Sequence, residues 1–277
     1  MDYNEANNDN KGEIKMMMIF VFLICFGASI VGAICGIGGG VIIKPLLDAF
    51  HIAPVSTISF LSGCTVLAMT SYSVIKSRMS GTSNVEFKTG FPLAAGAAIG
   101  GLIGKWAFAF IQSLSENKER VGAIQAACLM VVTLGTLLYT INKQKINTHH
   151  VKNSAAAALI GLTLGIMSSF LGIGGGPINL VVFYFFFSMT TKAAAENSLY
   201  VIFFSQLASF LQSWITGKIP EFAPMLLCFM IAGGILGGIY GRKINKKLNE
   251  KHVERLFVAL MVVVILINVY NIYRFLA

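Results

Sequence analysis

Two copies of one glycine-rich motif, each inside an apolar stretch, limit what this chain can fold into. Residues 36–40 and residues 172–176 both read Gly-Ile-Gly-Gly-Gly. Each glycine costs the interior of a helix roughly 1 kcal/mol relative to alanine, so the motif ends a helix. Each copy follows about twenty mostly apolar residues and precedes about ten more. We therefore predict two helix breaks at membrane depth, which are tolerated only where they are buried in protein or line a cavity.

Long apolar runs recur along the chain of 277 residues, which is 56% hydrophobic and only 12% charged. Runs of this length are typical of membrane-spanning helices, so we predict an all-α membrane protein. The net charge of +9 comes mostly from residues between these runs, where cytoplasmic loops collect Lys and Arg. A nucleic-acid-binding protein would need a basic face on a soluble domain, which the sequence lacks. The five cysteines lie singly in apolar runs, which indicates neither disulfides nor a zinc site.

The chain divides into two matching halves. We predict a disordered polar tail at residues 1–15, a first repeat at 16–141, a linker at 142–153 and a second repeat at 154–277. Each repeat is expected to hold about four transmembrane helices and one glycine-broken half-helix. At an offset of 137, the first repeat's Gly96, Gly100, Gly101, Gly104 and Lys105 fall on Gly233, Gly237, Gly238, Gly241 and Arg242. We interpret these glycines as faces for helix packing.

The distribution of basic residues favours one of two topologies. If each half-helix merely extends the helix before it, ten Lys and Arg residues lie on one side and nine on the other. If each half-helix folds back as a hairpin, the division is thirteen to six. Cytoplasmic loops carry the excess of positive charge, so the hairpin topology is favoured. It makes the two repeats inverted, with both chain ends outside and the linker in the cytoplasm.

The short stretch after each motif supplies a helix N-terminus, with unpaired backbone N–H groups and a positive partial charge. Such an end suits an anion. We expect the first short helix to begin at Val41 and the second at Pro177, because proline fits a first helical position that needs no N–H. In inverted repeats the two ends would face each other near the midplane. Alternatively, the glycines only allow helices to pack closely.

We predict a substrate site formed by the glycines, the first residues of both short helices and two matching serines. Its candidate residues are Gly36, Gly38, Gly39, Gly40, Val41, Lys44, Ser62, Gly172, Gly174, Gly175, Gly176, Pro177, Asn179 and Ser198. Ser62 and Ser198 are included because they correspond at an offset of 136. Hydroxyl and amide groups in such positions can also serve only to hold helices together.

We identify three charged residues inside the predicted segments: Lys44, Lys105 and Glu196. Lys44 either attracts an anion or extends to the membrane surface. Lys105 is interpreted as structural or interfacial. Glu196 is a candidate for proton coupling, and the alternative is an acid that stabilises the first turn of a helix. No Ser/His/Asp set, metal cluster or pair of carboxylates lies inside the segments, so we predict neither an enzyme nor a cofactor or metal.

The two motifs, with Lys44-Pro45-Leu46-Leu47 after the first and Pro177 after the second, resemble those of the TauE/SafE family, the sulfite exporter and sulfonate permease group. The resemblance covers about residues 16–275. It implies a secondary transporter of sulfur-containing anions such as sulfite, thiosulfate or organosulfonates, for which proton coupling is often proposed. The chain departs from the family pattern at residues 193–198, Ala-Ala-Ala-Glu-Asn-Ser, which lack the Gly-Thr-Ser kind of sequence common in such proteins.

We therefore expect a secondary transporter in the cell membrane. Its expected partners are a small anionic substrate and the lipid bilayer, with no nucleic acid, and a homo-oligomer is left open. Two alternatives also stay open: a cation-coupled transporter or channel for another small solute, and a membrane scaffold that transports nothing. The first alternative needs buried acids, and Glu196 is the acid that the sequence offers for it.

Overall fold

The computed structural model describes residues 3–80, 87–114, 118–173 and 175–276, without the side chains of 3–14, 87–88, 118 and 276. The predicted disordered tail at residues 1–15 falls almost entirely on residues whose side chains lie outside this description, and it stays a prediction. The described chain is helical, as predicted. Its elements are α1 (Tyr3–Cys35), α2 (Gly40–Ala49), α3 (Val55–Met79), α4 (Phe87–Leu114), α5 (Lys118–Asn142), the 3-10 turn η1 (Lys143–Lys145), α6 (Ser154–Phe170), α7 (Pro177–Phe187), α8 (Thr191–Ile215), α9 (Pro224–Lys247) and α10 (Glu250–Leu276).

Each glycine motif ends a helix because its backbone takes conformations that other residues avoid. Gly36 and Gly38 have φ angles of +74° and +73°, and Gly172 has a φ of +66°. Only glycine adopts such angles without strain. The first short helix begins at Gly40 rather than at Val41, because the carbonyl of the preceding residue already accepts hydrogen bonds from the amides of the first helical turn. The second short helix begins at Pro177, as predicted.

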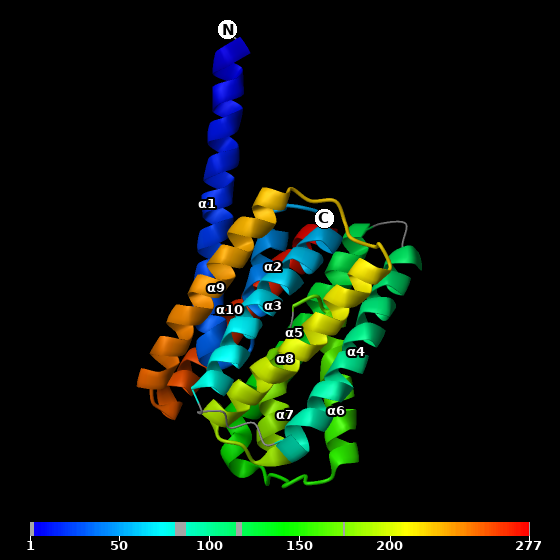
Figure 1. The fold of residues 1–277 in the computed structure, drawn as a ribbon, viewed down its shortest axis with the longest axis vertical. Coiled ribbons are helices and arrows are strands. Elements are labelled where there is room, and N and C mark those ends of the chain that lie inside the picture. Colours follow the sequence, from blue (N-terminus) through cyan, green and yellow to red (C-terminus); the bar gives the residue numbers. More distant parts are fainter. Residues whose placement is uncertain (1–2, 81–86, 115–117, 174, 277) are drawn as a thin grey trace.

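Each short helix folds back beside the helix that precedes it. At the end of α2, the ring of Phe50 lies 5.0 Å from that of Phe20, which lies near the middle of α1. At the end of α7, the carbonyl of Phe185 accepts a hydrogen bond from the amide of His149, in the linker that leads into α6. Both hairpins are visible in Figure 1, where the chain ends lie at one side and the linker at the other. The chain path therefore agrees with the topology that the loop charges favoured.

The glycine faces of α4 and α9 pack against other helices, as predicted. A Cβ added to Gly100 would lie 2.1 Å from the carbonyl oxygen of Leu162 in α6. A Cβ added to Gly237 would lie 2.4 Å from the carbonyl oxygen of Phe26 in α1. Thus α4 packs on α6, and α9 on α1. In each pair, a helix of one repeat packs on a helix of the other, and the two pairs correspond to each other. This arrangement supports the inverted repeat, whose details stay a prediction.

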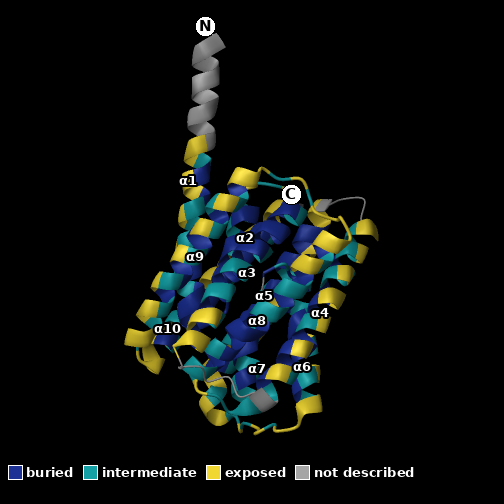
Figure 2. Ribbon diagram, viewed as in Figure 1, coloured by how far each residue is buried: buried dark blue, intermediate teal, exposed yellow. Residues whose placement is uncertain are grey.

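Seven helices in the described chain are long and apolar enough to cross a membrane. We predicted about four such helices in each repeat, and α6 is the one that falls short. It has 17 residues because the second glycine break ends it at Phe170. Large apolar side chains, Trp106 and Leu138 among them, are exposed on the outward faces of these helices. Figure 2 shows exposed residues around the outside of the helices and buried residues between them. An apolar exterior of this kind suits contact with lipid.

The thirteen-to-six division of positive charge predicts that the linker faces the cytoplasm and both chain ends face outside. We expect a reporter that is active only in the cytoplasm to be silent when it is fused after Ala277. The same reporter inserted into the linker at residues 142–153 is the matched control and is expected to be active. Strong activity of the C-terminal fusion would contradict this orientation.

Candidate functional site

The two glycine breaks lie against each other in the core. A Cβ added to Gly40 would lie 1.9 Å from the carbonyl oxygen of Ile173, so here the two backbones touch. A Cβ added to Gly175 would lie 3.3 Å from the carbonyl oxygen of Ile37. Both isoleucines are buried. We call this contact, between residues 36–40 and 172–176, the glycine crossing; Gly174 lies outside the described residues.

Helices α3 and α8 enclose the glycine crossing. Gly36 packs on Ala195 of α8, where an added Cβ would lie 2.2 Å from the Cα atom. Gly172 faces Ser59 of α3, whose Oγ would lie 2.7 Å from an added Cβ. Gly38 and Gly39 of the first break contact α1, where Gly38 lies against Gly32 and Gly39 against Ser29. The crossing is therefore built from backbone, with side chains of α1, α3 and α8 around it.

Two predicted site residues meet beside the second break. The amide nitrogen Nδ2 of Asn179, near the start of α7, donates a hydrogen bond of 3.2 Å to Oγ of Ser198 in α8. Both side chains are buried. Pro177 and Val41, the candidate residues in the first turns of the short helices, are buried as well. The structure therefore places an amide and a hydroxyl next to the N-terminal turn of α7.

Ser62 is fully buried in α3, and its hydroxyl has no hydrogen-bond partner within the described chain. It is three residues after Ser59, which contacts Gly172, and four before Val66, which contacts Gly40. Residues at these spacings share one face of a helix. Ser62 therefore lies on the face of α3 that is turned to the glycine crossing. Its membership of a substrate site stays a prediction.

Of the two roles considered for Lys44, extension to the membrane surface is wrong, and attraction of an anion stays a prediction. Lys44 does not extend to the surface, because its side chain is buried. It is also not a free cation, because Nζ donates a hydrogen bond of 2.6 Å to Oδ2 of Asp48, one turn later in α2. The side chain still lies near the second break, where Cε would be 3.4 Å from a Cβ added to Gly172. Lys44 is thus a buried ion-paired residue at the glycine crossing.

Asp48 was missed among the charged residues of the predicted segments. Its side chain is buried, and its second oxygen, Oδ1, has no hydrogen-bond partner in the described part of the chain. The spacing of four residues from Lys44 is the signal that could have revealed the pair, because such residues are neighbours on a helix. A carboxylate is expected to be buried only when it is paired. The pair therefore leaves α2 with little net charge at this depth.

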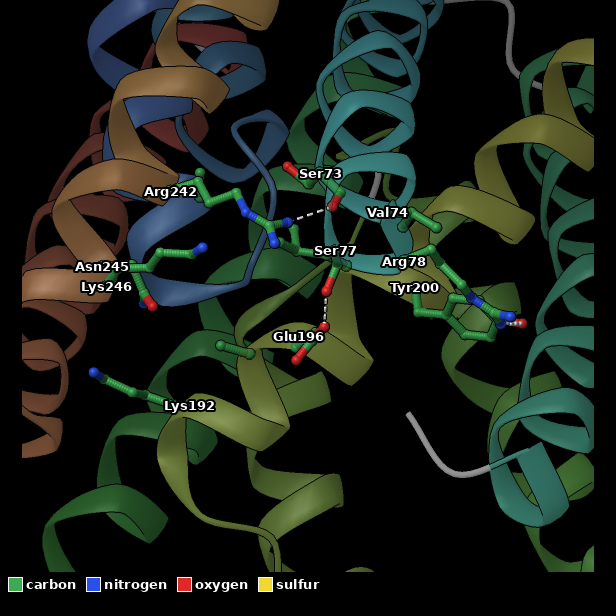
Figure 3. A pocket seen from close by; sticks show the side chains of 13 residues that line it. Ser73, Val74, Ser77, Arg78, Lys192, Glu196, Tyr200, Arg242, Asn245 and Lys246 are labelled. Atoms are coloured by element: carbon green, nitrogen blue, oxygen red, sulfur yellow. Dashed lines mark hydrogen bonds between the residues drawn. The ribbon is translucent and has the colours of Figure 1, made fainter. Parts of the chain in front are cut away.

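A cavity of about 440 Å³ opens beside the glycine crossing, on the side of the linker. We call it the linker-side cavity. It reaches Ala195, which packs on Gly36, and so ends at the first break. It is lined by Ala33, Ser73, Val74, Ser77, Arg78, Lys192, Ala195, Glu196, Leu199, Tyr200, Arg242, Asn245 and Lys246. Figure 3 shows these side chains, contributed mainly by α3, α8 and α9.

The linker-side cavity is basic. Arg78, Lys192, Arg242 and Lys246 line it, against the single carboxylate of Glu196. Arg242 donates a hydrogen bond of 2.6 Å to the carbonyl of Ser73, which fixes its guanidinium at the wall of the cavity (Figure 3). Glu196 accepts a hydrogen bond from Ser77. Several positive charges around one concave surface raise the local concentration of anions.

Most of these basic residues lie in predicted loops, where no local pattern groups them. Arg78, Lys192 and Arg242 are at least 50 positions apart in the sequence and belong to three different helices. Glu196 was identified, but its alternative role is wrong, because α8 begins at Thr191 and places it beyond the first turn. It lines the cavity instead.

Comparisons with known proteins place the chain in a family. The family model described as sulfite exporter TauE/SafE matches residues 21–267. Probable membrane transporter protein YunE of Bacillus subtilis (strain 168) is 23% identical over 227 residues, which cover 73% of this chain and 81% of that protein. Probable membrane transporter protein YdhB of the same organism is 23% identical over 185 residues, which cover 66% and 74%.

No solved structure gave a significant match. The family match extends over most of the chain and includes both glycine breaks, α3 and α8. The chain therefore belongs to the TauE/SafE sulfite exporter family of membrane transporters.

Proposed function

We propose that this protein is a secondary transporter of small sulfur-containing anions, which it binds at the glycine crossing. The observation that carries the proposal is the position of this crossing. Two helix breaks meet in the buried core, and a basic cavity leads to them from the side of the linker. Irregular backbone at such depth is expected only where it serves a path or a site.

The crossing offers hydrogen-bond donors that suit an oxyanion. The first turns of α2 and α7 carry backbone N–H groups without helical partners, together with the positive ends of the helix dipoles. Asn179 and Ser198 add an amide and a hydroxyl next to the second break. Ser62 adds a buried hydroxyl on the facing side of α3. Sulfite, thiosulfate and sulfonates each present several oxygen atoms that can accept such hydrogen bonds.

The excess of positive charge in the linker-side cavity favours an anionic solute. An anion that enters the linker-side cavity meets Arg78, Lys192, Arg242 and Lys246, whereas a cation meets only Glu196. This balance favours the anion transporter over the cation-coupled alternative. Sulfur enters the proposal through the description of the family model. We retain Glu196 as the candidate for proton coupling, because its carboxylate lines the path that the anion would take.

Uptake into proteoliposomes tests the proposal. We expect the purified protein to transport at least one of labelled sulfite, thiosulfate and a sulfonate, and not a cationic solute of similar size. Replacing both Lys192 and Lys246 by Gln is expected to raise the KM by about tenfold, because the charged mouth concentrates the anion. Added salt should reduce this difference by screening.

Lys247→Gln is the matched control, because Lys247 is exposed on the same helix end but does not line the cavity. Repeating the assay with Glu196→Gln under a pH gradient tests coupling: the variant should lose the dependence on the gradient. Folded protein that transports none of the three anions would contradict the proposal.

A further inference from the structure

A second, much smaller cavity lies on the other side of the glycine crossing, toward the chain ends. We call it the terminus-side cavity. Its volume is about 20 Å³, room for about one water molecule. Gly172 of the second break lines it, together with Ser59 of α3 and Lys105 of α4. The crossing therefore has a large cavity on the linker side and a much smaller one on the opposite side.

The terminus-side cavity is equipped for an anion. Lys105 lies with its ammonium 5.9 Å from the ring centre of Phe60, and no carboxylate pairs with it among the described residues. The hydroxyl of Ser59 is buried and has no hydrogen-bond partner in the described structure. The hydroxyls of Ser169 and Ser209, bonded to each other at 2.6 Å, line the same space. A positive charge beside the unused hydroxyl of Ser59 favours a small oxyanion.

The two cavities correspond to each other through the predicted repeat. At an offset of 136, Ser59 and Cys64 of α3, which line the terminus-side cavity, fall on Ala195 and Tyr200 of α8, which line the linker-side cavity. Phe60 and Gly63, which also line the terminus-side cavity, fall in the same way on Glu196 and Leu199 of the linker-side cavity.

The correspondence also runs in the opposite direction. At the same offset, Ser209, Phe210 and Ser213 of α8 in the terminus-side cavity fall on Ser73, Val74 and Ser77 of α3 in the linker-side cavity. Each cavity is thus formed by one end of α3 and the complementary end of α8. Two unrelated pockets would not be lined by matching positions on both helices.

The cationic residues correspond as well. Lys105 of α4 falls at an offset of 137 on Arg242 of α9, and each lines its own cavity. Every residue that lines the terminus-side cavity, except Gly172 and Gln206, corresponds at an offset of 136 or 137 to a residue that lines the linker-side cavity. The residues of the linker-side cavity without partners in the other lining are all cationic: Arg78, Lys192 and Lys246.

We propose that the two cavities are alternating vestibules of a single anion path, and that Lys105 binds the anion on the terminus side as Arg242 does on the linker side. This inference rests on the proposed transport function. In the present structure the linker-side vestibule is open. When the halves exchange conformations, the linker-side vestibule closes and the terminus-side vestibule opens around Lys105 and Ser59.

Native Cys64 reports on this opening without any substitution in the cavity, because it lines the terminus-side vestibule and is buried in the present structure. Oriented proteoliposomes are treated with a charged, membrane-impermeant thiol reagent during transport, and the labelled peptides are identified by mass spectrometry. We expect Cys64 to be labelled from the side of the chain ends and not from the side of the linker. Cys25, fully buried in α1 and outside both cavities, is the internal control and should stay unlabelled.

Val74→Cys provides the complementary probe, because Val74 lines the open linker-side vestibule. It should be labelled from the linker side. If Cys64 stays unlabelled from both sides during turnover while this probe is labelled, the alternating pair is overturned. If Cys64 is labelled as expected but no sulfur anion is transported, the proposed substrate fails and the two-vestibule inference stands.

The role of Lys105 is tested by measuring the KM separately for anion added on each side of the membrane. Lys105→Gln is expected to raise the KM about tenfold for anion added on the side of the chain ends, as expected for loss of a charge-assisted hydrogen bond. The KM for anion added on the linker side should change much less. Arg242→Gln should show the opposite pattern, and Lys105→Arg should restore much of the lost affinity. An equal effect of Lys105→Gln on both sides would assign Lys105 a structural role and overturn its place in the vestibule.

Discussion

Gly40→Ala is expected to reduce transport strongly, although it adds a single methyl group. The new Cβ would lie 1.9 Å from the carbonyl oxygen of Ile173 and 2.6 Å from its carbonyl carbon. Both are backbone atoms of the other break, so no side-chain rotation can relieve the clash. Overpacking of this kind costs about 1–3 kcal/mol, and relief requires the two breaks to separate. We expect transport in proteoliposomes to fall to roughly a tenth of wild type or less.

Gly27→Ala is the matched control, because it makes the same chemical change in the helix that leads into the first break. Nothing lies within 4 Å of a Cβ added there. Alanine is favoured over glycine by about 0.5–1 kcal/mol in a helix, so this variant should be as stable as wild type or slightly more so. Both variants are compared by thermal unfolding and by uptake. Wild-type transport by Gly40→Ala would show that the close contact of the breaks is not required.

Asp48→Leu is expected to be the most destabilising single substitution among the charged residues. It removes the partner of Lys44 and leaves a buried ammonium group without its 2.6 Å hydrogen bond. Breaking a buried ion pair by removing one partner typically costs about 3–5 kcal/mol. Unfolding titrations in detergent should show this loss directly. The variant should also yield little folded protein.

The double variant Lys44→Met/Asp48→Leu separates stability from transport. Replacing both charges by apolar side chains leaves no unpaired group, so stability should return to within about 1 kcal/mol of wild type. We expect transport to remain at least about tenfold lower, because the ammonium of Lys44 then no longer attracts the anion near Gly172. Wild-type transport by the double variant would limit the pair to a structural role.

Glu254→Gln is the control for the loss of an ion pair as such. Lys143 and Glu254 form a pair of 2.5 Å near the end of α5, with side chains 15% and 32% exposed. Because water reaches this pair, its loss should cost less than about 1 kcal/mol. The contrast with Asp48→Leu then measures the effect of burial.

The glycine motifs and the loop charges were sufficient to predict much of the fold. Both motifs end helices, Pro177 begins α7, and both short helices fold back. These features could be predicted because they depend on local properties: the conformations open to glycine and proline, and the length of apolar runs. The spacing of Gly96 to Gly104 likewise identified a packing face, which meets α6.

The candidate site could be predicted only in part. Asn179 and Ser198 were both selected, and the structure joins them by a hydrogen bond. Lys44 is a candidate from the sequence but Asp48 is not, because Lys44 was considered only as a ligand for an anion and not as the ion-pair partner of a residue four positions later. Lys105 is interpreted from the sequence as structural or interfacial, although it corresponds to Arg242 in the second repeat. Nothing in its neighbourhood in sequence shows that it lines a cavity.

The sequence by itself determined the helical membrane class, the two breaks and the way in which each half folds back. Only the tertiary structure decided which charges converge. Arg78, Lys192 and Arg242 lie on three different helices and share one cavity because α3, α8 and α9 come together beside the glycine crossing. The physical reason is that glycine, proline and hydropathy act locally, so their effects can be derived from neighbouring residues. The contacts that make a cavity join distant residues and depend on which face of nearly uniformly apolar helices turns inward, which periodicity does not reveal.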